Sequence, residues 1–276
     1  MLLGLGLVFV RDYLDDSIKS GQDAEHLTAL PILGTIAVVK GVEAQDKVVT
    51  LSSPQTAAAE AYRVLATNIE FSSFDHPIRT LVVTSGSPGE GKTTTIANLA
   101  VAFVQMGKRV IVVDGDLRGA ALHHYFALPN TGGLTAALLA RGAKVDEYLQ
   151  PTNLNNLYVL TSGPLPPNPG ELVLSAGFRR MLEALRQYFD YVVLDSPPVT
   201  NVSDARILGV NADSTVLVIK AFSTSRHHAR EAATHLRNAN VHLGGVVLND
   251  VGLGRRSHYA RYYSAYSGYH SNRNAG

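Results

Sequence analysis

The segment GSPGEGKT at residues 86–93 limits the possible folds of this chain more than any other feature of its sequence. It matches the pattern G-x-x-x-x-G-K-[ST] in full, follows an apolar run at 81–84 and opens a helical stretch at 92–106. In such a loop, glycines let backbone N–H groups turn inward around phosphate oxygens, and the helix amino terminus adds positive potential. The pattern therefore predicts a phosphate-binding strand–loop–helix unit, with an ordinary glycine-rich turn as the alternative. The residues expected to line the phosphates are Ser87, Pro88, Gly89, Glu90, Gly91, Lys92, Thr93 and Thr94.

Short apolar runs recur from residue 80 onward, separated by stretches long enough for helices. The runs show little alternation, which is typical of strands covered on both faces, and they lie at 81–83, 110–113, 157–160, 191–194, 216–219 and 245–248. Helices are expected between them at 92–106, 134–140, 178–188, 204–209 and 225–240. This order predicts an α/β fold of the P-loop NTPase type, a parallel sheet flanked by helices. We also expect a helix at 55–71, a small accessory strand within 31–39 and a helix-free proline-rich loop at 163–170.

Three aspartates stand at the ends of two of these runs. Asp114 and Asp116 close the run at 110–113, and Asp195 closes the run at 191–194. Because ligands of open parallel sheets bind at the carboxyl ends of the strands, we expect these carboxylates near Lys92 and Thr93. Lys92 can reach the β- and γ-phosphates of a nucleotide, and the Thr93 hydroxyl can bind Mg²⁺. The alternative is that each aspartate caps a following helix, although the two prolines after Asp195 argue against that.

Composition narrows the classes of protein further. The chain has 276 residues, of which 46% are apolar, 17% are charged and none is cysteine. These values exclude wholesale disorder, disulfides, thiolate zinc sites, iron–sulfur clusters and cysteine nucleophiles. The formal net charge of +1 excludes a broad nucleic-acid-binding surface, and no nucleic-acid partner is expected. The charge is uneven, because residues 251–276 carry +4 and the remainder carries −3.

The two ends of the chain differ in character. Residues 1–10 are apolar and uncharged, but a ten-residue helix spans about 15 Å, only half of a bilayer core. This segment is therefore not a complete membrane helix, and it fits a signal peptide poorly. It can be a buried strand or helix start, or the trailing half of a membrane helix that enters the cytoplasm at Arg11, and the segment alone does not decide between them.

The last residues read as a flexible tail. They hold five tyrosines among Ser, Gly, His, Asn and Arg, with almost no aliphatic residue to bury. A solvated terminus, or a basic and aromatic strip for single-stranded nucleic acid or polysaccharide, is one interpretation. The five tyrosines are Tyr259, Tyr262, Tyr263, Tyr266 and Tyr269.

The three motifs SGSPGEGKTT, VVDGDLR and VVLDSPP together resemble those of the bacterial tyrosine kinases (BY-kinases) of capsule and exopolysaccharide biosynthesis. That family combines the phosphate loop with an Asp-x-Asp strand and an Asp-[Ser/Thr]-Pro-Pro strand, and ends in a tyrosine cluster. The resemblance covers residues 12–270. It implies a membrane end with a juxtamembrane region at 1–50, a kinase domain at 51–250 and a tyrosine-rich tail at 251–276, working at the cytoplasmic face of the bacterial inner membrane.

The resemblance also implies roles for single residues. ATP and Mg²⁺ would be the cofactors, with Lys92 neutralising charge and the ion held by Thr93, Asp116 and Asp195. Asp114 would be the candidate base. The tail tyrosines would accept phosphate, presented to an adjacent subunit of a homo-oligomer built through Glu60 and Arg63. Further partners would be a membrane polysaccharide co-polymerase segment and a protein-tyrosine phosphatase. We also expect phosphorylation to dissolve the subunit ring, because each phosphate adds about −1.5 to −2 to the tail.

The chain departs from the family pattern at two places. Ala66 stands where the oligomer motif Glu-x-x-Arg-x-x-Arg has its last arginine, and Gly119-Ala120 replace a basic residue and a proline. The competing family is that of the partition and septum-positioning ATPases, which would be nucleotide switches without kinase activity. Their phosphate loop carries an extra lysine at the position of Ser87 here.

The sequence does not settle the roles of a few further polar residues. Arg118 can contact phosphate or a strand-end carboxylate, and Asn249 can approach the adenine or form a turn. The pairs His123-His124 and His227-His228 are expected to be surface histidines, because adjacent side chains on a helix diverge by about 100°.

Overall fold

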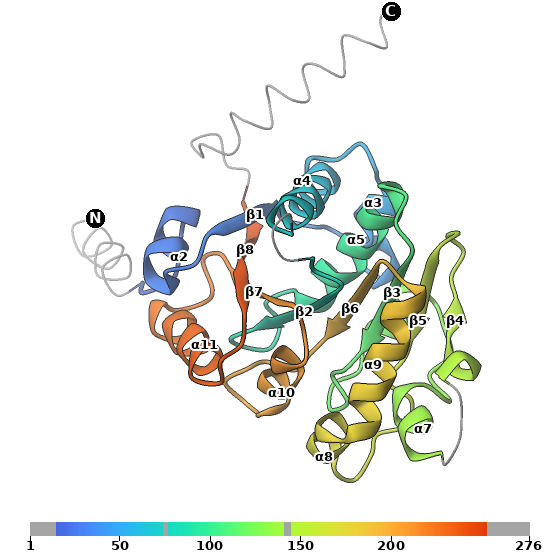
Figure 1. Cartoon of the computed structure of the whole chain (residues 1–276). Helices are drawn as coiled ribbons and strands as arrows, with labels where there is room; N and C mark the ends of the chain where they lie inside the picture. The colour runs from blue at the N-terminus through green and yellow to red at the C-terminus, as the bar shows by residue number, and fades with distance from the viewer. Residues whose placement is uncertain (1–14, 74–76, 141–144, 253–276) are drawn as a thin grey trace, which may run out of the picture.

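A computed structural model describes residues 15–73, 77–140 and 145–252 (Figure 1). In these ranges one eight-stranded sheet has the strand order β1-β8-β7-β2-β6-β3-β5-β4, and every adjacent pair is parallel except β4 with β5. The strands are β1 (Ile32–Ala37), β2 (Thr80–Ser85), β3 (Val110–Asp114), β4 (Gln150–Pro151), β5 (Leu157–Leu160), β6 (Tyr191–Asp195), β7 (Ser214–Lys220) and β8 (Leu243–Val251).

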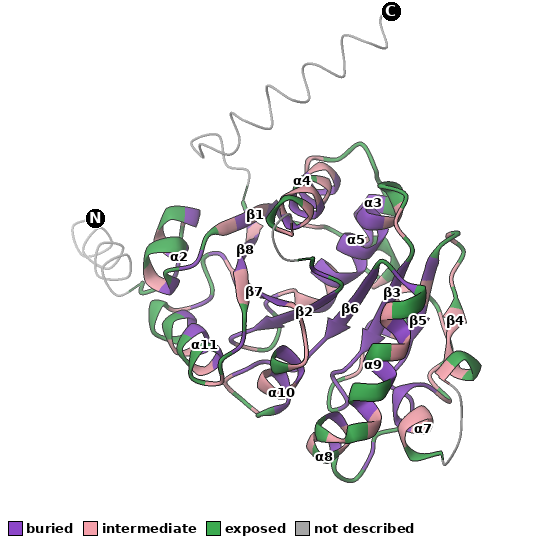
Figure 2. Cartoon of the chain, in the orientation of Figure 1, coloured by how far each residue is buried: buried purple, intermediate pink, exposed green. Residues whose placement is uncertain are grey.

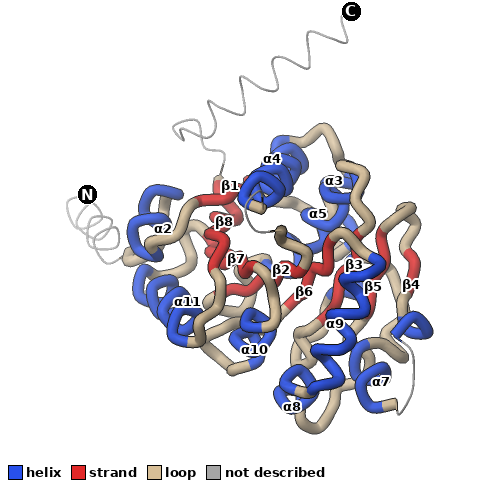
Figure 3. Tube along the Cα trace, viewed as in Figure 1, coloured by secondary structure: helices blue, strands red, loops and turns tan. Residues whose placement is uncertain are grey.

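Helices cover both faces of this sheet, and Figure 3 shows the strand layer running between them. The α-helices are α2 (Gly21–Thr28), α3 (Val49–Ser52), α4 (Ala57–Ser72), α5 (Lys92–Gln105), α6 (Leu122–Tyr125), α7 (Leu134–Leu139), α8 (Pro169–Leu174), α9 (Ala176–Tyr188), α10 (Asp204–Val210) and α11 (Arg226–Asn238). Two 3₁₀ turns, η1 (Gln45–Lys47) and η2 (Val145–Tyr148), complete the described elements.

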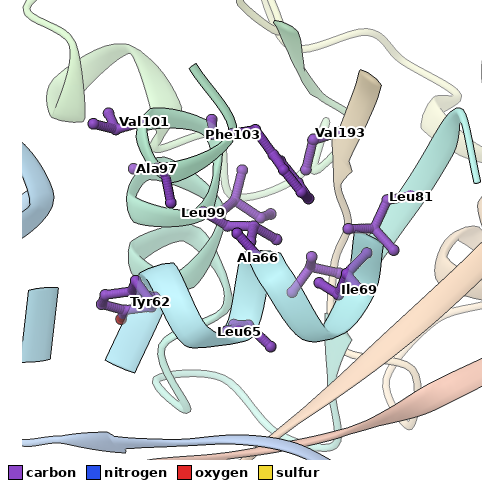
Figure 4. Close-up of a cluster of buried hydrophobic side chains, with 14 of the residues drawn as sticks. Tyr62, Leu65, Ala66, Ile69, Leu81, Ala97, Leu99, Val101, Phe103 and Val193 are labelled. Atoms are coloured by element: carbon purple, nitrogen blue, oxygen red, sulfur yellow. The ribbon is translucent and has the colours of Figure 1, made fainter. Parts of the chain in front are cut away.

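The central strands are apolar throughout because each of their faces meets a helix layer. Leu81 and Val83 of β2 pack with α4 and α5, whereas Val82 between them packs on the opposite face with α9. Figure 2 shows the resulting buried sheet between helices that are exposed only on their outer sides. In Figure 4, Ile69 of α4 and Phe103 of α5 point into the same apolar cluster. This double cover is what a run of β-branched and leucine residues without alternation requires.

The predicted α/β fold is confirmed. The six apolar runs form β2, β3, β5, β6, β7 and β8, and the predicted helices are α4, α5, α7, α9, α10 and α11. The accessory strand expected within 31–39 is β1, which belongs to the main sheet as an edge strand parallel to β8. The expectation of a helix-free loop at 163–170 is wrong at its end, because α8 begins at Pro169, and proline is favoured in the first turn of a helix.

Two predictions concern residues outside the described ranges. These are the membrane-segment interpretation of residues 1–10 and the tail with its five tyrosines. Among the described residues, the helices are all too short or too polar to cross a bilayer.

The strand order brings the motif-bearing strands together. Strand β6 lies between β2 and β3, and Asp195 at its end is in register with Asp114 on β3 and with Val83 on β2. All three strands run in the same direction, so their carboxyl ends meet at one edge of the sheet, beside the amino terminus of α5.

Candidate active site at the carboxyl edge of the sheet

The loop between β2 and α5 has the backbone shape that its glycines predict. Gly89 and Gly91 have φ values of 78° and 95°, a region that other residues rarely adopt. A Cβ atom on Gly91 would also lie 2.1 Å from Nδ2 of Asn249, so the position has no room for a side chain. Within the described part of the chain, no side chain caps α5 at Gly91. The N–H groups of its first turn can therefore bind an anion.

Lys92 lies among the three aspartates that the sequence singles out. Its Nζ is 3.0 Å from Oδ2 of Asp116 and 3.9 Å from Oδ1 of Asp195. The hydroxyl of Thr93 donates a hydrogen bond of 2.7 Å to Oδ2 of Asp195. Asp114 is the register partner of Asp195 on the neighbouring strand. The structure thus brings together all four residues that the sequence analysis assigned to catalysis, together with Thr93.

These carboxylates are buried and only partly neutralised. Asp114 has no exposed surface, and burial together with the charge of Asp195 raises its pKa to about 8. Its Oδ2 accepts a hydrogen bond of 3.2 Å from the Leu122 N–H, while Oδ1 has no partner among the described residues. Burial also raises the pKa of Asp195, against the charge of Lys92. For Lys92, burial lowers the pKa, but the charges of Asp195 and Asp116 outweigh it and raise the value.

Three carboxylates beside one ammonium group carry a surplus of negative charge in a buried place when all three are ionised, and this repulsion adds to the rise of the pKa of Asp114 and of Asp195. A divalent cation fits this donor set, because Mg²⁺ prefers hydroxyl and carboxylate oxygens. In the described ranges, no group of three or more His, Asp or Glu side chains is arranged so that it could hold a metal ion by itself. Mg²⁺ usually needs none, since it takes one or two carboxylates and completes its shell with water and substrate phosphates. Thr93, Asp116 and Asp195 can supply the protein's share of such a shell.

The side chain of Glu90 is buried, although the residue belongs to the phosphate loop. It is only 3% exposed, and its Oε2 accepts a hydrogen bond of 3.0 Å from the Ser87 N–H. Its Oε1 accepts one from the hydroxyl of Thr224, which follows β7. Glu90 can therefore contribute to anion binding through its main chain, while its carboxylate is engaged inside the protein.

The structure gives the contacts of Arg118 and Asn249 within the protein. The guanidinium of Arg118 donates a hydrogen bond of 2.8 Å to the carboxylate of Asp204 in the first turn of α10, and the Arg118 N–H donates one of 3.3 Å to Oδ1 of Asp116. Asn249 lies in β8, and its Nδ2 donates a hydrogen bond of 2.9 Å to the carbonyl of Glu90. Asn249 is thus a contact of the phosphate loop itself.

Helix α4 carries the residues that the resemblance assigned to oligomerisation. Arg63 forms an ion pair of 2.9 Å with Glu60 and also donates to the carbonyl of Pro54. Ala66 is fully buried against α5, as Figure 4 shows, so this position contributes nothing to the outer surface of the helix. The face of α4 that is available for a contact therefore contains the glutamate and the first arginine of the motif.

Three contacts of the loop were not expected from the sequence. The hydroxyls of Tyr125 and Thr94 are hydrogen-bonded at 2.7 Å, and the hydroxyl of Thr200 donates to the carbonyl of Gly86. The third is the contact of Thr224 with Glu90. The one sequence feature that could have indicated these contacts is the position of Tyr125 and Thr200, which follow the two aspartate motifs within ten residues.

Comparison with known proteins identifies relatives of this chain. A family model described as an AAA domain matches residues 78–239. The tyrosine-protein kinase YwqD of Bacillus subtilis (strain 168) is 41% identical over 223 residues, which cover 81% of this chain and 94% of YwqD.

The solved structures show the same likeness. The kinase domain of the Escherichia coli tyrosine kinase ETK superposes with a TM-score of 0.80 at 26% identity, covering 87% of this chain and 97% of that domain. The chimerical protein CapA2B2 gives a TM-score of 0.78 at 34% identity, covering 84% of this chain and all of that one. The septum site-determining protein MinD of Pyrococcus horikoshii OT3, solved with Mg-ADP, shares the fold at a lower TM-score of 0.53, with 26% identity and coverage of 65% and 72%. Since YwqD is 41% identical over most of both chains and the ETK kinase domain superposes over 87% of this one, the chain belongs to the family of bacterial tyrosine-protein kinases.

Proposed function

We propose that this protein transfers the γ-phosphate of ATP, with Mg²⁺, to tyrosines of the C-terminal cluster of an adjacent subunit, within a bacterial polysaccharide export system. The observation that carries the proposal is the contact of Lys92 with Asp116 and Asp195 beside the hydroxyl of Thr93. A buried cation flanked by carboxylates and a metal-binding hydroxyl is what phosphoryl transfer requires, since catalysis there depends on alignment and on neutralising charge.

Each residue of the site has one task in this proposal. The N–H groups of residues 89–94 hold the phosphates, and Lys92 neutralises charge on the β- and γ-phosphates. Thr93, Asp116 and Asp195 bind Mg²⁺ directly or through water. When bound, the ion would supply positive charge that helps to neutralise the phosphates. Asp114 accepts the hydrogen bond of the attacking tyrosine and orients it.

The transfer step balances without any further reactant. The tyrosine oxygen forms a bond to the γ-phosphorus, the bond from that phosphorus to the bridging oxygen of ADP breaks, and the proton of the tyrosine passes to the carboxylate of Asp114. A cation bound beside Asp195 favours the ionised form of Asp114, which the transfer needs. The products are phosphotyrosine and ADP.

The proposed roles of the tail and of the partners rest on family membership and on charge. A tail of +4 is attracted to a body of −3, and five phosphates would reverse the sign of the tail to roughly −4 to −6. In the proposal, phosphorylation therefore releases the tail from its neighbour and dissolves the homo-oligomer, and a protein-tyrosine phosphatase restores it. In the proposal, the region 1–50, whose strand β1 is part of the same sheet as the kinase domain at 51–250, links that domain to a membrane co-polymerase partner at the cytoplasmic face of the inner membrane.

Incubation with γ-labelled ATP and Mg²⁺ tests the proposal. We expect label on tyrosine in the native protein and none after Lys92→Met or after replacement of the five tail tyrosines by phenylalanine. A mixture decides whether transfer occurs between subunits: label on the Lys92→Met chain, supplied by the tyrosine-free chain, requires transfer in trans. Free phosphate without phosphotyrosine would instead indicate an ATPase switch of the septum-positioning type. The absence of both products would indicate an inactive regulatory module.

The native mass before and after labelling tests whether phosphorylation dissolves the oligomer. An unchanged mass would contradict that part of the proposal.

A further inference from the structure

The carboxylate of Glu90 has three features that the transfer reaction itself does not explain. It is a charged side chain within the phosphate loop, it is 3% exposed, and it accepts hydrogen bonds from the Ser87 N–H and from the Thr224 hydroxyl. Burial raises the pKa of Glu90, against the hydrogen bonds from Thr224, Ser87 and Gly86 that stabilise its charge. An exposed carboxylate in this loop would repel a triphosphate, and here it is turned away and matched with donors.

The main chain of Glu90 is held as well. Nδ2 of Asn249, on β8, donates a hydrogen bond of 2.9 Å to the Glu90 carbonyl. The same nitrogen lies so close to Gly91 that a Cβ there would clash at 2.1 Å. The loop is therefore attached at one residue to the ends of two further strands, through Thr224 after β7 and through Asn249 on β8.

The attachment point after β7 is itself rigid. The Thr224 hydroxyl accepts a hydrogen bond of 3.0 Å from the Lys220 N–H, and the Thr224 N–H donates one of 3.0 Å to the Lys220 carbonyl. The Ile18 N–H donates a hydrogen bond of 2.9 Å to the Thr224 carbonyl. Thr224 is 5% exposed. A side chain fixed by this many partners can hold the loop in one conformation.

We propose that Glu90 is a positioning residue, which fixes the phosphate loop to the ends of β7 and β8 so that the loop binds nucleotide in a preformed shape. Glu90 engages the first N–H groups of the loop, and those that follow are left to face the phosphates. The inference rests on the proposed nucleotide site, but it concerns binding and not the transfer step. A preformed loop binds more tightly because less conformational entropy is lost on binding.

Three variants of the full chain test it: Glu90→Ala, Glu90→Gln and Thr224→Val, each measured with a fluorescent ADP analogue and Mg²⁺. Glu90→Ala leaves donors unpaired and should raise Kd about tenfold, the equivalent of one lost charge-assisted hydrogen bond. Glu90→Gln should recover most of this loss, because an amide can accept from the Ser87 N–H and donate to the Thr224 hydroxyl. Thr224→Val keeps the shape and removes one donor, so a smaller increase of about threefold is expected.

Glu70→Ala is the matched control, because Glu70 is also held by two side chains, Lys108 and Tyr191, but at the opposite edge of the sheet. It should leave Kd unchanged. Native Kd in Glu90→Ala would overturn the proposal, and so would a Glu90→Gln variant as weak as Glu90→Ala, since charge and not hydrogen bonding would then be decisive. If Glu90→Ala does not fold, Glu90→Gln and Thr224→Val decide.

The same measurement separates the two proposals. A native protein that binds the analogue without forming phosphotyrosine contradicts the kinase proposal and leaves the test of Glu90 intact. A native protein that does not bind the analogue contradicts both.

Discussion

The carboxylates at the two edges of the sheet differ in how far they are buried and in how many cationic partners they have. At the amino edge, Asp213 accepts hydrogen bonds from the N–H groups of Arg79 and Thr80, at 2.9 and 2.7 Å, and pairs with Arg186 at 3.1 Å. Glu70 there is bonded to both Lys108 and Tyr191. At the carboxyl edge, three aspartates that are at most 5% exposed lie around a single lysine.

The difference indicates that the charged groups of the amino edge stabilise the fold, whereas those of the carboxyl edge serve the function. Partly exposed, one-to-one pairs cost little desolvation and help to hold the amino edge together. Buried carboxylates in excess of their cations destabilise the fold, and such clusters are typical of sites that bind a ligand. The carboxyl edge is therefore the less stable one in the absence of a bound cation, and three predictions test the contrast.

The largest effect is expected from removing Lys92, the lysine that lies among the three aspartates of the carboxyl edge. Lys92→Met should lower the rate of tyrosine phosphorylation at least about 100-fold, because charge developing on the phosphates is no longer neutralised. The initial rate of label incorporation measures this, with thermal unfolding as the check that the variant folds. A rate within a factor of three of the native enzyme would show that the lysine is not part of the reaction.

An intermediate effect is expected on stability without Mg²⁺. Burial and the charge of Asp195 raise the pKa of Asp114 from 3.8 to about 8. The unfolded chain therefore releases this proton near pH 4 and the folded chain only near pH 8, so the free energy of unfolding falls as the pH rises between these values. Asp114→Asn should remove this fall and be more stable at pH 8 by at least about 1.4 kcal/mol.

Urea unfolding in chelator at pH 4.5 and pH 8 measures the effect of Asp114→Asn. The variant and the native protein should have similar stability at the lower pH, and added Mg²⁺ should reduce the gain at the higher pH. A variant that is less stable than the native protein at pH 8 would contradict the idea that the carboxyl edge is under electrostatic strain.

The smallest effect is expected at the amino edge. Glu70→Ala removes the partner of Lys108 and Tyr191 and should lower the free energy of unfolding by about 1 kcal/mol. The rate of phosphorylation, normalised to folded protein, should not change. Urea unfolding and the labelling assay together measure this. A loss of activity without a loss of stability would mean that the two edges are not separate in function.

Placement of the aspartates shows what could be predicted. Asp114 and Asp195 were expected beside Lys92 because parallel strands bring their carboxyl ends together. Asp195 lies 3.9 Å from Lys92 and is in register with Asp114. The partner of Arg118 could not be predicted, since Asp204 lies 86 residues away and the choice depended on how α10 packs. Glu90 was expected to line the phosphates, and only the fold reveals that its carboxylate is turned inward.

The sequence by itself determined the fold class, the phosphate loop and the identity of the acidic residues around it. These follow from local patterns, because strand runs, glycine positions and strand-end residues act over a few neighbouring residues. The tertiary structure decided which aspartate pairs with Lys92, that Ala66 faces the core and that Thr224 and Asn249 hold the loop. Those contacts join residues up to 159 positions apart, and they depend on the order of the strands in the sheet and the packing of helices on it, which no local pattern specifies.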